Sequence, residues 1–437
     1  MWKRLVNSRA FYAVALVVLF LAFARSQFRL EEVDPRPLGE VADIGLLSES
    51  TDLNIIFVLI DTLRSDRLGT YGYERDTSPV LDALAADGLR FAHHMSQSSW
   101  TKCSMASLWT GLYPTAAGVT RFDDVLAADA EMPAEVLKRN GFVTTGLYRN
   151  GWVEGYFGID KGIDVSTRPA SMPLEDSIRR ANPTVKEVGT DVDAIAASKE
   201  FLRIHGDDRW FLYLHLMDIH EYLYDEDSAL FGSDYSSVYD SSILRTNLVL
   251  EELFRFMKAE GDLDNTLVGI TADHGEAFGE RGIEGHARWV YRETTDVPLI
   301  FSLPFKIPGG LVVNSVTRNI DIWPTILDLL GIEGLAASDG VSQRPAIVAA
   351  LEGNENPENS ESALAHLDRN WGRRDAPVEN TVSIVGDGYR YVLTQRVGGE
   401  VVEELFDLEN DPAELENVME REAETADALR LSLIHIC

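Results

Sequence analysis

Continuous apolar runs that alternate with helical patterns are the feature that most constrains how this chain folds. The first run, Asn54–Ile60, carries no charged residue, which is typical of a strand buried on both faces of a sheet. Similar runs follow at 142–147, 210–216, 266–271 and 297–303. Between the runs, 79–87 and 244–259 place apolar residues at helical spacing. This alternation predicts a three-layer α/β/α domain around a mixed, mostly parallel sheet.

The rest of the chain is organised around this domain. A length of 437 residues suits one large domain with a smaller appendage. Small and acidic residues over 334–359 mark a boundary, and short apolar runs at 382–385 and 389–394 predict strands beyond it. We therefore expect an acidic, irregular linker, a large domain and a small C-terminal α+β subdomain, at 26–52, 53–335 and 336–430 respectively. The last residues, 431–437, read like a translated sequencing adapter and form a possible non-native tail.

The N-terminus has the order of an export signal, because basic residues lead into an apolar run at 10–24 that ends at Arg25. The small-x-small triplet at 22–24 is the pattern that signal peptidase reads. The run is shorter than the roughly 20 residues of a comfortable membrane span. We expect cleavage of 1–25, with an uncleaved inner-membrane anchor as the alternative. Either outcome predicts a periplasmic or cell-envelope protein.

Charge and cysteine content exclude several classes of function. The 39 basic and 71 acidic residues give a formal net charge of −32, which repels nucleic acid and anionic lipid. Two cysteines are too few for a disulfide framework. An enzyme of this charge that acts on an anionic ester needs a local concentration of positive charge.

Carboxylate and imidazole side chains follow two of the predicted strands directly. Asp61 comes after the first run, and Asp273 and His274 come after the run at 266–271. Ligands of such sheets bind at the carboxyl ends of the strands, so we expect the three side chains at one edge. Alone, Asp61 could cap a helix and the second pair could belong to a turn. Together they offer a metal two hard oxygens and a nitrogen.

A hydroxyl at the start of a predicted helix completes this set. Thr101 precedes small and then apolar residues, and a helix N-terminus favours an anionic ligand. A threonine there is ordinarily a helix cap. Beside a metal, its hydroxyl can instead lose a proton and attack phosphorus or sulfur.

These residues lie in segments that resemble the sulfatase family of the alkaline phosphatase superfamily. The segments span about 54–418 in the family's order, and their sequences are IDTLRSDRLGTYGYERDTSPVLDALAADGLRF, SWTKCSMASLWTGLYP, HLMDIH, DNTLVGITADHGEAFGERG, EGHARWVY and ELFDLENDPAELENV. The resemblance implies an alkaline-phosphatase-like fold. It also implies that Asp61, Asp273 and His274 hold a metal and that Thr101, as nucleophile, bridges metal and substrate.

The resemblance assigns further roles to basic side chains. His220 and His286 match histidines that contact the ester oxyanion or the leaving group, whereas His215 is interpreted as a buried structural residue. Arg149 lies near a family lysine that binds substrate, although Gly151 stands where the family has a neighbouring histidine. The remaining candidates for substrate binding, through charge neutralisation, are Lys102 and Arg64.

The departures from the family pattern affect the predicted chemistry. Sulfatases carry Cys or Ser in C/S-x-P-x-R and convert it to formylglycine, whereas this chain has Thr101, Cys103 and Met105 at the three defined positions. Threonine cannot become formylglycine, so none is expected. Threonine-using branches of the superfamily act on phosphorus. Thr62 stands where many sulfatases have another Asp, which suggests one divalent ion, Mn²⁺, Mg²⁺ or Ca²⁺ rather than Zn²⁺.

The sequence therefore predicts a metal-dependent hydrolase or transferase of sulfate or phosphate esters that prefers phosphate or phosphonate. One alternative is a sulfuric ester hydrolase that works without formylglycine, and another is a non-catalytic envelope binding protein with the same fold. The substrate class extends to small molecules, lipid headgroups and glycan esters. The loops at 169–186 and 222–240 are expected to select among them.

Overall fold

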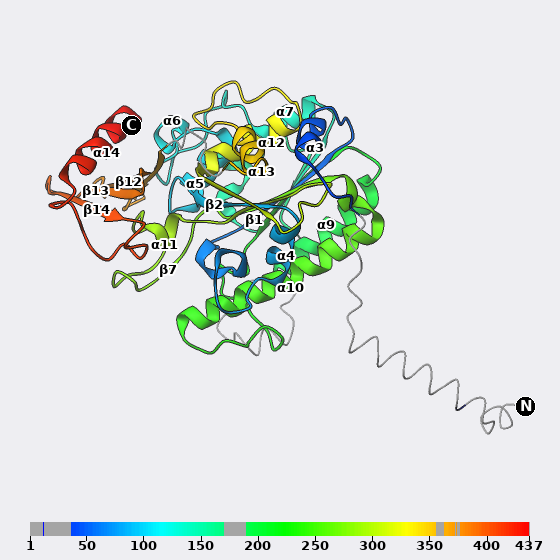
Figure 1. The fold of residues 1–437 in the computed structure, drawn as a ribbon, viewed down its shortest axis with the longest axis horizontal. Helices are drawn as coiled ribbons and strands as arrows, with labels where there is room; N and C mark the ends of the chain where they lie inside the picture. The colour runs from blue at the N-terminus through cyan, green and yellow to red at the C-terminus, as the bar shows by residue number, and fades with distance from the viewer. Residues whose placement is uncertain are drawn as a thin grey trace, which may run out of the picture. The chain divides into compact units, whose positions relative to one another are not determined.

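An eight-stranded mixed sheet forms the centre of the computed structural model (Figure 1). The structure describes residues 12, 36–169, 189–354, 362–371, 373 and 376–436, and residues 37–437 belong to one compact unit. The strands run in the order β10-β2-β9-β6-β1-β5-β3-β4. Their bounds are β1 Asn54–Ile60, β2 Leu89–Met95, β3 Val143–Tyr148, β4 Val165–Thr167, β5 Trp210–Leu216, β6 Thr266–Thr271, β9 Leu299–Ser302 and β10 Leu311–Arg318.

Strand β9 is the one member of this sheet that runs against its neighbours. It pairs antiparallel with β2 and β6, whereas all the other neighbouring strands pair in parallel. The predicted mixed, mostly parallel sheet is therefore confirmed.

Helices cover both faces of the sheet, as the alternating apolar runs predict. On β1, Ile55, Phe57 and Leu59 pack into one apolar cluster, and the residues between them pack into a second cluster on the opposite face. The first cluster includes side chains of α3 Val41–Leu47, α5 Thr101–Thr110, α7 Pro133–Arg139, α12 Ile322–Leu329 and α13 Arg344–Leu351. The second includes side chains of α4 Pro79–Asp87, α9 Asp191–His205 and α10 Tyr235–Glu260. Figure 1 shows these two sets of helices on opposite sides of the strands.

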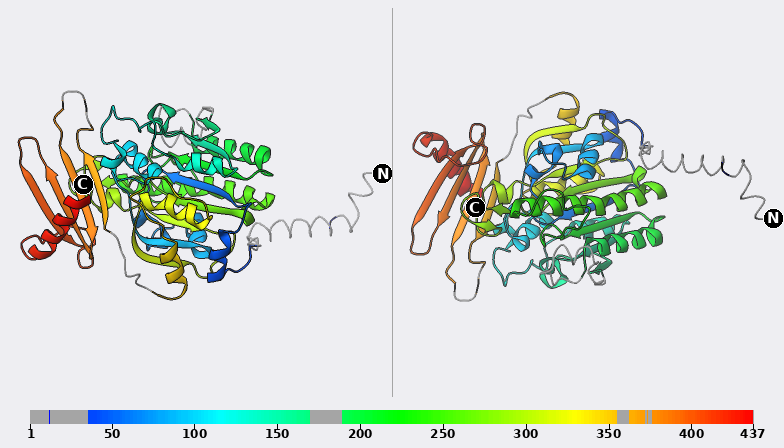
Figure 2. Two further views of the ribbon diagram at one scale, coloured as in Figure 1. Left: turned by 90° about the horizontal axis from the view of Figure 1, so that it is seen from above. Right: turned by 90° about the horizontal axis from the view of Figure 1, so that it is seen from below.

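A separate antiparallel sheet forms the C-terminal subdomain (Figure 2). Its strands, in order, are β11 Ala363–Asp368, β12 Asn380–Gly386, β13 Tyr389–Gln395 and β14 Val401–Asp407. Helix α14, Ala423–Ile436, packs Ala426, Leu429 and Leu433 against this sheet.

Short elements complete the described fold. They are the hairpin of β7 Ala277–Phe278 and β8 Glu284–Gly285, helices α6 Pro114–Ala117 and α11 Arg292–Thr295, and six 3-10 helices at Ser65–Arg67, Gly69–Tyr71, Gly151–Val153, Gly155–Phe157, Asp262–Asn265 and Asn319–Asp321.

Two expectations about the chain outside the core differ from the structure or lie outside it. The region 26–52, expected to be irregular, contains helix α3, which forms because Ile44 and Leu47 are buried against the core. The apolar run of the export signal lies, apart from Tyr12, outside the described residues. Among the residues that are described, no helix has the length and apolar character needed to cross a membrane.

Candidate metal centre and its cavity

The predicted metal ligands meet at the carboxyl edge of the central sheet. Asp61 follows β1, and Asp273 and His274 follow β6, which lies beside β1 in parallel register. All three side chains are fully buried, and one ligand atom from each lies within 4.8 Å of the others. The parallel strands therefore bring together residues that are more than 200 positions apart in sequence.

The carboxylate of Asp61 is held by one oxygen only. Its Oδ2 accepts a hydrogen bond from Asn150 Nδ2 at 2.7 Å and lies 3.2 Å from His215 Nε2. The His215 ring is fixed in turn by the Tyr213 hydroxyl, 2.7 Å from Nδ1. The other oxygen, Oδ1, is buried and has no hydrogen-bond partner among the described residues. Asp61 thus presents an oriented and unsatisfied oxygen.

Asp273 has the same arrangement, built from backbone groups. Its Oδ1 accepts from the backbone N–H of His274 at 2.9 Å and of Thr62 at 3.3 Å. Thr62 takes a φ of 64°, a left-handed conformation that non-glycine residues seldom adopt. Asp273 Oδ2 is buried 3.3 Å from His274 Nε2 and has no hydrogen-bond partner in the described part of the chain.

The imidazole of His274 turns a lone pair toward these oxygens. Its Nδ1 lies 3.0 Å from the carbonyl oxygen of Gly275. Because a carbonyl oxygen can only accept, Nδ1 carries the proton of the neutral ring and Nε2 is unprotonated. Burial, followed by the positive charge of His286, lowers the pKa of His274 to about 3. Nε2 therefore faces Asp61 Oδ1 at 4.0 Å and Asp273 Oδ2 at 3.3 Å as a third electron-pair donor.

These three atoms fit a divalent cation. Burial raises the pKa of Asp273 well above its usual value, and the adjacent charge of Asp61 adds to the effect. Burial acts on Asp61 in the same direction, but the charge on His220 and the hydrogen bond with His215 hold its pKa below the ordinary range. Buried carboxylate oxygens without partners are costly, and a cation between them and an imidazole nitrogen removes that cost.

Thr101 stands beside the three donor atoms at the start of a buried helix. It is the first residue of α5, whose ten residues are all buried. Its Oγ1 lies 3.0 Å from His274 Nε2, and since Nε2 carries no proton, the hydroxyl donates. The sequence prediction of a hydroxyl at a helix N-terminus agrees with this position.

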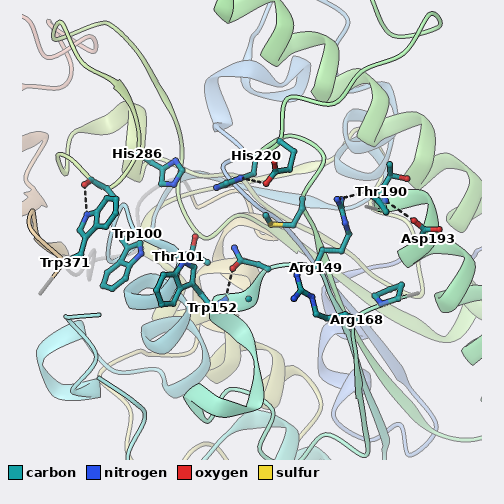
Figure 3. Close-up of a pocket in the computed structure, with 17 residues that line it drawn as sticks. Trp100, Thr101, Arg149, Trp152, Arg168, Thr190, Asp193, His220, His286 and Trp371 are labelled. Atoms are coloured by element: carbon teal, nitrogen blue, oxygen red, sulfur yellow. Dashed lines mark hydrogen bonds and ion pairs between the residues drawn. The ribbon is translucent and has the colours of Figure 1, made fainter. Parts of the chain in front are cut away.

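A cavity of about 690 Å³ opens above Thr101 (Figure 3). Three tryptophans gather on one side of Thr101, and Arg149 and Arg168 lie on the other. The lining residues are Trp100, Thr101, Arg149, Asn150, Gly151, Trp152, Arg168, Pro169, Gly189, Thr190, Asp193, Met217, His220, Glu221, His286, Ala287 and Trp371. This volume suits a ligand much larger than a sulfate or phosphate group.

The two histidines singled out in the sequence both line the cavity. The ring of His286 stacks on His274 with centroids 4.4 Å apart, and the ring of His220 lies 5.2 Å from that of His286. His286 Nδ1 lies 3.2 Å from a carboxylate oxygen of Glu276. Burial alone would lower the pKa of His220, but the charge of Asp61 and the contact with Glu221 raise it to about 9.

The three basic candidates for substrate binding have other partners. Arg149 reaches the cavity wall, but its NH1 binds Asp191 at 2.9 Å and Asp218 at 2.6 Å. Lys102 and Arg64 do not belong to the lining described above. Lys102 Nζ donates to backbone carbonyl oxygens at 121 and 122, and Arg64 forms ion pairs at 66 and 280. The carboxylates that pair with Arg149 and Arg64, and the carbonyl oxygens that bind Lys102, occupy the positive charges that substrate binding would require.

Other site residues were not singled out in the sequence. Asn150, which orients Asp61, follows β3, and the parallel pairing of β3 with β5 could have placed it at the same edge. Trp371 comes from the C-terminal subdomain and has no signal of this kind. Of the two loops expected to select the substrate, Pro169 lines the cavity and 170–186 lies outside the described residues. The segment 222–240 contributes no lining residue. Glu221, directly before it, is the last residue of that stretch on the cavity wall.

Comparison with known proteins gives consistent matches. The Sulfatase family profile matches residues 53–332, and the profile for the C-terminal region of N-sulphoglucosamine sulphohydrolase matches 279–434. An ulvan-active sulfatase of Formosa agariphila is 26% identical over 380 residues, 75% of this chain and 73% of that protein. Arylsulfatase K of Xenopus laevis is 22% identical, over 78% of this chain and 74% of its own. The crystal structure of a phosphonate monoester hydrolase of Agrobacterium radiobacter superimposes with a TM-score of 0.69 at 20% identity, covering 88% of this chain and 95% of that one.

Proposed function

The chain belongs to the sulfatase family, and from this premise we propose that it is a metal-dependent ester hydrolase or transferase with Thr101 as nucleophile and phosphorus as the reacting centre. One observation carries the proposal. Thr101 Oγ1 lies 3.0 Å from His274 Nε2, beside two buried carboxylate oxygens that have no hydrogen-bond partner. A hydroxyl held among metal-ligand donors, at the floor of a large cavity, is suited to attack a bound ester.

The chain's own residues define where a metal would sit. Asp61 Oδ1, Asp273 Oδ2 and His274 Nε2 would hold the ion, and Thr101 Oγ1 is near enough to join them. When bound, a divalent ion supplies Lewis acidity, which lowers the pKa of an adjacent hydroxyl and polarises an ester oxygen.

Transfer then uses groups that line the cavity. Thr101 releases its proton to water in the cavity as Oγ1 forms a bond to phosphorus, and the bond from phosphorus to the leaving oxygen breaks. His220 or His286, both on the cavity wall, donates a proton to that leaving oxygen. Water, or an acceptor alcohol, next attacks phosphorus and gives its proton to the histidine that protonated the leaving oxygen. The bond from phosphorus to Oγ1 breaks, and Oγ1 regains a proton from water. The N-terminus of α5 favours the anionic group throughout.

The preference for phosphorus follows from the chemistry of threonine. Formylglycine arises from Cys or Ser, and the hydrate of its aldehyde expels sulfate by elimination, a route that a threonine ester lacks. The likeness to a phosphonate monoester hydrolase is consistent with this reading. Two sulfatases among the relatives support a second candidate, a sulfuric ester hydrolase that cleaves its threonine ester by direct attack of water.

A substrate panel with two variants tests the proposal. An aryl sulfate, a phosphate diester and a phosphonate monoester are compared with metal-loaded enzyme, and we expect the phosphorus esters to react faster. Thr101→Ala should lose turnover while its metal content stays near that of the wild type, and Thr101→Ser should retain part of the activity. Full activity of Thr101→Ala would falsify the assignment of the nucleophile. A faster reaction with the aryl sulfate would favour the second candidate.

Export is the second part of the proposal. The basic and apolar order of residues 1–25 supports a signal peptide or anchor. N-terminal sequencing of protein from a periplasmic fraction distinguishes cleavage near residue 25 from retention of the whole segment. Recovery from the cytoplasm alone would contradict export.

A further inference from the structure

A tryptophan from the C-terminal subdomain forms part of the cavity wall in a constrained conformation. Trp371 has a φ of 54°, which is uncommon for so bulky a residue. Its indole Nε1 donates to the carbonyl oxygen of Ala287 at 2.9 Å, and Ala287 itself has a φ of 55° and follows His286. The ring of Trp100 stacks parallel to it with centroids 6.1 Å apart. Trp371 is therefore fixed beside the catalytic cavity.

Two arginines lie over this fixed ring. The guanidinium carbons of Arg288 and Arg373 are 5.1 Å and 4.9 Å from the centroid of Trp371. Both side chains are exposed, and among the described residues neither has a carboxylate within ion-pair distance. Arg369 and Arg121, which lie nearby in the chain or fold, are instead paired with Glu379 and Asp368.

The contact with the Trp371 ring orients both guanidinium groups for binding an anion. A guanidinium that lies over an aromatic face keeps its N–H groups in its own plane, free to bind a carboxylate, sulfate or phosphate in bidentate fashion. The rigid ring also reduces the side-chain entropy lost on binding. The chain has a net charge of −32, so two guanidinium groups with no carboxylate partner among the described residues make the surface at Trp371 locally positive.

The cavity extends to the ring on which this pair lies, although neither arginine is among the residues that line the cavity. Its volume of about 690 Å³ exceeds what one ester group fills, and its wall runs from Thr101 and His286 to Trp371. Because Arg288 follows Ala287, it stands two residues beyond His286, one of the two histidines that can protonate the leaving oxygen in the proposed mechanism.

We propose that Arg288 and Arg373, held over Trp371, form a subsite for an anionic group carried by the leaving part of the substrate. The substrate class is an ester whose alcohol portion bears a second negative charge, such as a carboxylate. This inference rests on the proposed function, because it assumes that the leaving group lies toward His286.

Two synthetic esters with one reacting group test the subsite. They are 4-nitrophenyl phenylphosphonate and its 3-carboxy-4-nitrophenyl analogue, which differ in a carboxylate on the leaving ring. The double variant Arg288→Gln/Arg373→Gln should lose about tenfold or more in kcat/KM for the carboxylated ester, because a hydrogen bond to a charged group contributes roughly that factor. The loss should lie in KM, should shrink at high salt, and should stay below about twofold for the ester without the carboxylate.

The control is Arg203→Gln. Arg203 is an exposed arginine whose guanidinium carbon lies 5.1 Å from the ring centroid of Phe256. It belongs to the last turn of α9, the end of the helix that is farther from the cavity. It should change neither ester's kinetics. Equal losses for both esters in the double variant would overturn the subsite, since the arginines would then act on the fold or on the reaction itself.

A binding measurement keeps the two proposals separable. If neither ester reacts, the proposed function fails, and the subsite is then decided by calorimetry with the carboxylated phenol alone. Binding of this phenol that weakens about tenfold in the double variant, but not in Arg203→Gln, supports the subsite. Equal binding to wild type and double variant contradicts it.

Discussion

Two buried charge clusters of this protein are balanced in different ways. At the junction of the C-terminal sheet and the large domain, Arg390 of β13 is fully buried and lies between two acids. Its Nε and NH2 are each 2.6 Å from a carboxylate, of Glu414 and Asp296 respectively, and its NH1 donates to the Thr295 hydroxyl at 3.0 Å. The protein itself supplies the cation and the two anions of this cluster, and their ion pairs neutralise the buried charge.

At the end of β1 and β6 the chain supplies the acids without a balancing cation among their direct contacts. One oxygen of each carboxylate is oriented by protein donors, and the other points toward His274 Nε2 without a hydrogen-bond partner. Burial of acidic side chains is therefore not by itself a sign of a metal site. The informative feature is the pair of oxygens for which the described residues provide no hydrogen-bond donor.

The largest expected effect comes from removing one of these oxygens. In Asp273→Asn we expect turnover to fall by about 10³-fold or more, because a bound metal supplies several kcal/mol of transition-state stabilisation. The metal-free variant should melt no lower than the metal-free wild type, since the replaced carboxylate is uncompensated. Steady-state kinetics and thermal melts in chelator check both parts. A metal-free variant that melts far lower would mean that the cluster resembles the Arg390 junction.

The reverse pattern is expected at that junction. Arg390→Met removes the cation that Glu414 and Asp296 share. Breaking a fully buried pair costs about 3–5 kcal/mol of unfolding free energy, and the loss here should lie toward the lower end because Glu414 keeps its ion pair with Arg281 and Asp296 is partly exposed. The loss should be the same with and without divalent ion. Denaturant unfolding under both conditions measures it, with Arg390→Lys as the charge-retaining control. A loss that appears only when metal is removed would contradict the separation of the two clusters.

Metal removal should distinguish the clusters directly. With free ion at 100 times its dissociation constant, binding to the folded state adds about 2.7 kcal/mol to the stability. Chelation should remove this increment from the wild type and from Arg390→Met alike, and should change Asp273→Asn little. Melts titrated with Mn²⁺, Mg²⁺ and Ca²⁺ follow the increment and rank the ions. An increment that persists in Asp273→Asn would place the ion elsewhere.

The sequence predicts the strands and the metal ligands of the central sheet better than the contacts of the C-terminal subdomain. Runs such as Asn54–Ile60 and Thr266–Thr271 predict their strands, because a strand buried on both faces needs apolar residues throughout. Asp61 and Asp273 are predicted together because parallel strands end at one edge. The sequence does not predict strand β10. This strand lies at the edge of the sheet and its residues alternate in burial, so it has no continuous apolar run.

Partners that arrive from distant segments could not be predicted in this way. The ion pairs of Arg390 join β13 to Asp296 and Glu414, and the wall residue Trp371 reaches the cavity through the docking of the second sheet. Periodicity and motif spacing carry no information about such docking. The same limit applies to Arg149, whose proximity to a family lysine gave no sign of its ion pairs with Asp191 and Asp218.

The smallest effect concerns a residue that orients a ligand without offering one to the metal. Asn150 donates to Asp61 Oδ2 at 2.7 Å and so directs Oδ1 toward His274. Groups that orient metal ligands typically contribute 10–100-fold to affinity, and we expect a loss of about this size in Asn150→Ala. Metal titrations followed by activity measure it, and turnover should recover as the ion concentration rises, unlike in Asp273→Asn. Asn140→Ala, an exposed asparagine that ends α7, serves as the control and should leave affinity unchanged. If Asn150→Ala binds metal as tightly as the wild type, the remaining contact of Oδ2, with His215, is sufficient to orient Asp61.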